Sequence, residues 1–169
     1  MRFLFFENDE AHQLGETPLP DGAVRIYRRV DDAAHLSYEG GTETKYIPVG
    51  QKAELPLGPA STVTVEPVLM ESKAEKFLFD REGNISGFDA IEGWLVRAKN
   101  RRDVPVRVEV TRNFRHGNHD LENFFAAPDA VAFVKDDLDT GKYTLEVPAR
   151  SETAFSYRIR YREGERAQK

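Results

Sequence analysis

The sequence predicts an all-β fold, a mostly antiparallel β-sandwich. Apolar residues recur at every second position in residues 104–110, 143–147 and 155–161, and polar or charged residues fill the positions between them. Because successive side chains of a strand point to opposite faces of its sheet, this period predicts strands with one buried and one wet face. Turn-forming residues separate the stretches at intervals of roughly ten residues, which is typical of sandwiches.

Weaker strand candidates come earlier in the chain. They are residues 2–6, 23–29, 34–38, 52–57, 61–70, 76–79 and 88–98. Residues 70–79 are also compatible with one or two helical turns, and residues 120–129 with a short helical piece or irregular chain. We therefore expect no long helix.

The chain of 169 residues suits one domain or two small lobes. We predict a single sandwich module over residues 1–163, which could divide into lobes at about 1–70 and 71–163, followed by a charged tail at 164–169 that frays. The formal net charge of −5 argues against general nucleic-acid binding. Cysteine is absent, which excludes disulfides and thiolate chemistry.

No apolar run approaches the roughly 20 residues that span a bilayer. The apolar start of the chain is too short for a signal-peptide core, runs straight into the polar residues 7–10, and is itself predicted as a strand from about residue 2. We therefore expect the chain to be part of a longer protein, and its localisation stays open.

Four segments carry a family resemblance. They are LGETPLPDGAVRIYRR (residues 14–29), YIPVGQKAELPLGPASTVTVE (46–66), AKNRRDVPVRVEV (98–110) and LEVPARSETAFSYRIRY (145–161). Together they resemble the domain of unknown function 4139 family, an uncharacterised bacterial family that also occurs in mucoidy inhibitor A-like proteins. The resemblance covers most of residues 1–162 and implies a β-sandwich with an immunoglobulin-like second half. It assigns no catalytic residue, and residues 115–127 match the family pattern least.

The stretch RHGNHD, residues 115–120, offers candidate metal ligands in His116, His119 and Asp120. Zinc takes four ligands in structural sites and three plus water in catalytic ones. A His-x-x-His pair supplies two, and the intervening glycine and asparagine are turn formers. We favour a polar loop here and predict no metal, cofactor or catalytic site. Nucleophile elbows and phosphate-binding glycine motifs are also absent from the sequence.

Arg158, Arg160 and Arg162 share the wet face of one predicted strand. Guanidinium groups bind carboxylate or phosphate in bidentate fashion, so this row is a candidate surface for an acidic partner or a glycan. The competing interpretation is cross-strand pairing with Glu109 and Glu146.

Two adjacent phenylalanines, Phe124 and Phe125, cannot both point inward from one strand. One of them is therefore a candidate partner contact. Trp94, in a central-looking strand, is better interpreted as a core residue.

These observations predict a non-catalytic structural or interaction module of a larger bacterial protein. The expected partner is a protein, with an acidic or glycan ligand also open. The alternatives are a metal-dependent enzyme or metal-binding domain that uses His116 and His119, and a carbohydrate-binding module. The resemblance would allow a periplasmic or cell-envelope location.

The loop interpretation predicts that zinc, nickel and a chelator leave the thermal unfolding midpoint unchanged, because an ion that binds the folded state would raise it by mass action. Differential scanning fluorimetry measures this. A zinc-dependent rise that a His116→Ala, His119→Ala double variant loses would establish the metal site instead.

Overall fold

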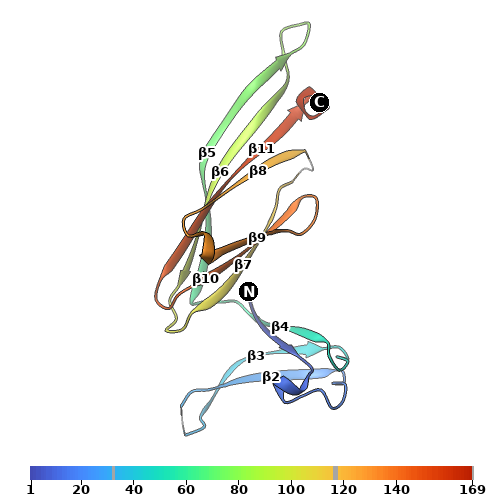
Figure 1. Ribbon diagram of the computed structural model, residues 1–169, viewed down its shortest axis with the longest axis vertical. Helices are drawn as coiled ribbons and strands as arrows, with labels where there is room; N and C mark the ends of the chain where they lie inside the picture. The colour runs from blue at the N-terminus through green and yellow to red at the C-terminus, as the bar shows by residue number, and fades with distance from the viewer. Residues whose placement is uncertain (32, 116–117, 169) are drawn as a thin grey trace. The chain divides into compact units, whose positions relative to one another are not determined.

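The computed structural model describes residues 1–31, 33–115 and 118–168, and Figure 1 draws its strands as arrows. Every strand pair described is antiparallel. Helical structure in these residues is limited to short 3-10 turns. The all-β, antiparallel prediction is therefore confirmed. None of the helices described has the length and apolar character that crossing a membrane requires.

The chain divides into two compact units, Met1–Ser61 and Thr62–Lys169. The first unit holds two strand pairs. Strand β1 (Arg2–Glu7) pairs with β4 (Lys52–Gly58), and β2 (Gly22–Arg29) pairs with β3 (Leu36–Thr44). The 3-10 turn η1 (Glu10–His12) follows β1. Among the described residues of the first unit, the buried apolar core is small and consists of Ile47, Ala53 and Leu55.

A fully buried amide fixes the loops of the first unit. Asn8, directly after β1, donates hydrogen bonds from Nδ2 to the carbonyl oxygens of Thr17 (3.1 Å), Ile47 (3.3 Å) and Pro48 (3.2 Å). Its Oδ1 accepts a bond from the Gly15 amide at 2.9 Å. A buried polar group costs free energy unless it is paired, and here both ends of the amide are paired.

The second unit contains two sheets. The four-stranded sheet has the order β5-β6-β11-β8, and the three-stranded sheet has the order β7-β10-β9. The strands are β5 (Val63–Phe79), β6 (Ile85–Asn100), β7 (Val106–Asn113), β8 (His119–Phe125), β9 (Val131–Lys135), β10 (Thr140–Val147) and β11 (Glu152–Gly164). Two further 3-10 turns are η2 (Pro128–Ala130) and η3 (Glu165–Gln168).

Both sheets contribute side chains to one core, as in a sandwich. The core includes Val96, Ala98, Phe155, Tyr157 and Ile159 from β6 and β11, and Val131, Tyr143, Leu145 and Val147 from β9 and β10. These residues occupy alternate strand positions, as the period of two predicts. The immunoglobulin-like character of this half stays a prediction.

Asn100 joins backbone segments of the second unit by hydrogen bonds, as Asn8 does in the first unit. Its Nδ2 donates to the carbonyl oxygens of Val104 (2.8 Å), Val147 (3.2 Å) and Pro148 (2.9 Å), and its Oδ1 accepts a bond from the Arg102 amide (2.9 Å). One side chain thus joins the end of β6 to the turn that follows it and to the end of β10.

The structure corrects several predicted elements. Residues 70–79, considered for helical turns, belong to the continuous strand β5, so a lobe boundary near residue 70 would cut a strand. Residues 120–129 lie largely in β8, and β9 was not predicted. In β8 the inward Asn123 and the outward Phe124 reverse the usual polarity, which explains why the alternation was not recognised.

The predicted frayed tail at 164–169 is also corrected for the residues described. Gly164 ends β11 in a left-handed conformation, with φ 59°, and η3 follows. Ser86 donates a hydrogen bond to Glu165 at 2.9 Å, and Arg166 bonds to Asp89. Glu165 and Arg166 are therefore held by specific polar contacts to β6.

Replacing Asn100 by leucine should lower the free energy of unfolding by about 3 kcal/mol, because three carbonyl oxygens lose their donor in a buried place. Urea unfolding followed by circular dichroism measures this. The control is Asn84→Leu in the exposed turn after β5, where a change within about 0.5 kcal/mol is expected. Equal losses in both variants would contradict the role of Asn100.

Candidate interaction surface

The outer face of the four-stranded sheet, opposite its core, carries the arginine row. Arg158, Arg160 and Arg162 alternate along β11 with the buried Tyr157, Ile159 and Tyr161. The prediction that the three arginines share the wet face is therefore correct.

Each arginine of the row has a carboxylate partner on another strand of the same sheet. Arg158 lies 3.2 Å from Glu71 of β5 and 3.5 Å from Glu122 of β8. Arg160 lies 3.3 Å from Glu75 of β5. Cross-strand pairing of this kind neutralises the surface of a sheet locally.

Arg162 bonds to Asp120 of β8 and to Asn118 Oδ1, the latter at 2.9 Å. The predicted partners Glu109 and Glu146 do not pair with these three arginines, and Glu146 lies opposite Arg107 in the register of β10 with β7. Glu109 contacts Arg107 at 3.5 Å, and both glutamates belong to the three-stranded sheet. In the strand order, β11 lies between β6 and β8, which therefore supply its nearest partners together with β5.

A buried carboxylate anchors one end of this face. Asp89 of β6 has a side chain that is 1% exposed. It accepts hydrogen bonds from Arg166 Nε at 2.9 Å and Nη2 at 3.0 Å, and Lys76 Nζ and Arg160 Nε approach to 3.6 Å and 4.0 Å. The bonds from Arg166, with Lys76 and Arg160 adding to their effect, hold the pKa of Asp89 below its ordinary value.

The two adjacent phenylalanines point to opposite faces, as expected. Phe124 is 44% exposed, and the Arg158 guanidinium lies 5.6 Å from its ring centroid. Phe125 packs into the core, with ring centroids 6.4 Å from Tyr143 and 6.3 Å from Phe155. Because its ring packs in the interior, Phe125 is not part of the predicted contact surface.

The candidate metal ligands are divided between roles. His119 lies in β8 with its ring 5.5 Å from Phe114, and Asp120 pairs with Arg162. His116 lies outside the described residues. Within the ranges that the structure describes, no group of three or more His, Asp or Glu side chains is arranged to hold a metal ion. Because His116 is not among the described residues, the metal hypothesis stays a prediction.

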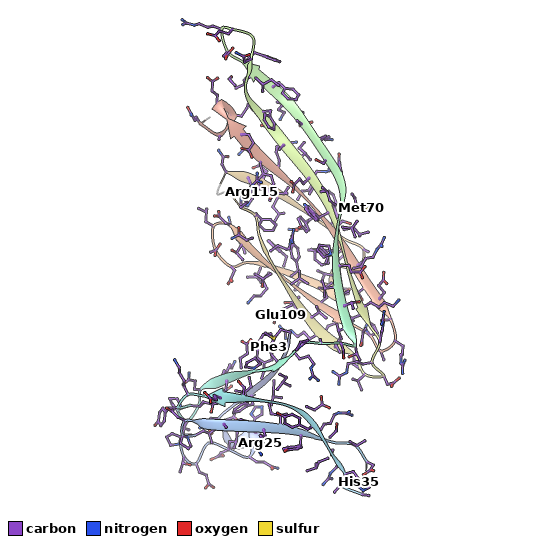
Figure 2. The ribbon with its side chains drawn as sticks, turned by 180° about the vertical axis from the view of Figure 1, so that it is seen from behind. Phe3, Arg25, His35, Met70, Glu109 and Arg115 are labelled. Carbon is purple, nitrogen blue, oxygen red and sulfur yellow. The ribbon has the colours of Figure 1, made fainter. Side chains whose placement is uncertain are left out.

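The other two histidines lie in the first unit, each beside an aspartate. His12 Nδ1 is 2.6 Å from Asp9, and His35 Nδ1 is 2.6 Å from Asp31. Figure 2 shows His35 at the end of the β2–β3 hairpin. Each histidine thus has a local structural partner.

Sequence reasoning missed a polar group around Trp94 on the inner face of the sheet. The indole Nε1 donates to Glu92 at 3.0 Å, and the Arg112 guanidinium lies 5.0 Å from the ring centroid. Arg112 also donates to the Tyr157 hydroxyl at 2.9 Å. Because Arg112 covers the ring and Trp94 packs against the core, the indole serves the interior, as predicted, and offers no open platform for a sugar.

Burial determines the direction in which the pKa values of the tyrosines beside this group are shifted. It raises the pKa of Tyr143 well above the ordinary value for a phenol, and it raises the pKa of Tyr157 and of Tyr161 in the same direction. The Tyr143 hydroxyl donates a hydrogen bond to Asn123 Oδ1 at 2.6 Å. These phenols therefore stay neutral and act as structural donors or acceptors.

An apolar row follows strand β5 and the turn to β6. Met70 is 64% exposed and Phe79 is 63% exposed, and Leu69, Phe77 and Ile85 are also exposed. Figure 2 labels Met70 on this strand. Within the described residues β5 pairs with β6 on one side and has no partner strand on the other. We call these five side chains the β5 apolar row.

Comparison with known proteins adds no relative to this description. No model of a known protein family matches the chain, and no curated protein matches it.

Replacing Asp89 by asparagine should lower the free energy of unfolding by about 2–3 kcal/mol at neutral pH, because buried charged hydrogen bonds are lost. Urea unfolding at several pH values measures this. The folded-state pKa of Asp89 is lowered, so its stabilisation is complete above the unfolded pKa of about 4 and disappears as pH falls through the folded-state pKa. The gap between wild type and variant should therefore narrow in acid.

The matched control for this prediction is Asp103→Asn, which removes an exposed ion pair with Arg150 and should change stability little. A gap between wild type and Asp89→Asn that is constant down to strongly acidic pH would contradict the account.

Proposed function

We propose that the chain is a non-catalytic interaction module and that the β5 apolar row contacts a partner protein. The observation that carries the proposal is the exposure of Leu69, Met70, Phe77, Phe79 and Ile85 along one edge strand and its turn. Exposed apolar side chains that gather on a surface mark interaction sites on soluble proteins. Here they form two groups, Leu69 with Met70 within β5, and Phe77 and Phe79 with Ile85 near the turn to β6, and the mostly polar residues 71–76 lie between the groups.

The edge of β5 favours contact through side chains over the addition of a further strand. Pro67 lacks an amide proton, and the register of β5 shifts between Leu69 and Glu71 and again between Glu75 and Leu78. Lys76 has a φ of 54° in the second irregularity. Proline, lysine and bulges are the features by which edge strands avoid indiscriminate pairing.

The arginine row is the weaker candidate for partner binding. Arg158, Arg160 and Arg162 are already bonded to carboxylates within the chain. An acidic partner or a glycan would have to displace those carboxylates, and each lost charged hydrogen bond would offset the new one. The β5 apolar row requires no such exchange.

We also propose that the chain belongs to the domain of unknown function 4139 family and forms part of a larger bacterial protein. The proposal is supported by the segments at residues 14–29, 46–66, 98–110 and 145–161 and by the all-β fold. The resemblance leaves a periplasmic or cell-envelope location open.

The test of the interaction surface is site-specific photo-crosslinking in the source cells. A benzophenone amino acid at position 70 or 79 should give a discrete protein adduct. The matched controls are positions 134 and 138, where Val134 is 61% exposed and Leu138 65% exposed away from β5. A Phe79→Asn substitution should remove the adduct at position 70 while it changes the free energy of unfolding by no more than about 0.5 kcal/mol.

Adducts of the same kind and yield at all four positions would show that the β5 apolar row has no special role. An absence of adducts at positions 70 and 79 would count directly against the proposed surface.

A further inference from the structure

The first unit contains an apolar cleft that its own side chains do not fill. Its volume is about 440 Å³. The cleft lies among β1, β4 and the start of β2, and its lining includes Leu4, Phe6, Leu19, Val24 and Leu55. It is lined entirely by residues of the first unit, whereas the β5 apolar row belongs to the second unit.

The cleft is open to solvent, and the unit around it buries few apolar side chains. In the described part of this unit, the buried apolar residues are Ile47, Ala53 and Leu55, whereas Leu4 and Phe6 at the cleft stay partly exposed. Filling the cleft would remove these side chains from water, at a gain of roughly 25 cal/mol for each Å² of apolar surface.

The charges of the lining restrict the ligand class. Asp21 is the one ionisable residue among the described residues that line the cleft, and none of them is basic. A ligand with a carboxylate or phosphate head would meet a like charge and no cation. An uncharged head would meet no electrostatic penalty, and a cationic head would be attracted to Asp21.

We propose that this cleft binds a small apolar molecule with an uncharged or cationic polar end, and that Asp21 selects against anions. Its volume falls within the range of roughly 300–1,000 Å³ that is typical of small-molecule pockets. Aliphatic and aromatic lining favours an alkyl chain or a ring system as the body of the ligand.

The chain offers a direct way to fill the cleft. Gly22 lines it, and a Cβ atom built on Gly22 would meet no atom within 4 Å. Gly22→Phe therefore adds bulk at the cleft without a steric clash at the backbone. Ala11→Phe is the matched control, because Ala11 is exposed in η1 of the same unit and does not line the cleft.

The experiment uses the full chain and the uncharged fluorescent probe N-phenyl-1-naphthylamine. The wild type should bind the probe with enhanced fluorescence, Gly22→Phe should weaken binding at least tenfold, and Ala11→Phe should stay within twofold of wild type. A Met70→Asn, Phe79→Asn variant should also stay within twofold, which separates the cleft from the β5 apolar row. Circular dichroism confirms that each variant is folded.

Competition tests the charge selection. Decyltrimethylammonium should displace the probe at a concentration at least fivefold lower than decanoate, and Asp21→Asn should remove that difference. No probe binding by the wild type, or equal binding by Gly22→Phe, would overturn the cleft proposal. Equal competition by both amphiphiles would overturn the role of Asp21.

Size-exclusion chromatography with light scattering tests a second copy as the occupant. A wild-type dimer that Gly22→Phe converts to a monomer would assign the cleft to self-association and overturn the small-molecule proposal. A mass that is the same for both proteins, together with the loss of probe binding, is the expected result.

Discussion

The antiparallel pairing of β6 with β11 is the constraint on which the second unit depends. Thirteen residues of β11 stay in register with β6, from Glu152 opposite Lys99 to Gly164 opposite Gly87. Because side chains alternate, this single register places Phe155, Tyr157 and Ile159 in the core and sends Arg158, Arg160 and Arg162 outward. A shift of one residue would exchange the two sets, so the core and the charged outer face are fixed together.

Buried amides solve the complementary problem of the loops. A strand satisfies its backbone groups through its neighbours, but a turn that enters the interior needs other partners. Asn8 and Asn100 each supply donors to three carbonyl oxygens and one acceptor to an amide. Asn8 directly follows β1, and Asn100 is the last residue of β6. The two units thus use the same local solution although their sheets differ in size.

The sequence was informative where burial alternates cleanly and uninformative where partners come from distant strands. The Val-rich strand β7 and the aromatic strand β11 were recognisable because their polar and apolar positions separate. Strand β8 was not recognised in the sequence, because the apolar Phe124 lies on its outer face and the polar Asn123 on its inner face. The cleft could not be predicted, because it joins residues as distant as Leu4 and Leu55. The carboxylate partners of the arginines also depend on the strand order, which the local pattern does not encode.

The built-in carboxylates of the outer face have a further thermodynamic consequence. A polyanion usually gains much of its affinity for an arginine-rich surface by releasing condensed counterions to bulk solvent. Here Glu71, Glu75 and Asp120 already take the place of those mobile ions, so a polyanion that approaches the row has little ion-release entropy to gain. Recognition of this face would therefore rest on shape and would vary only weakly with ionic strength.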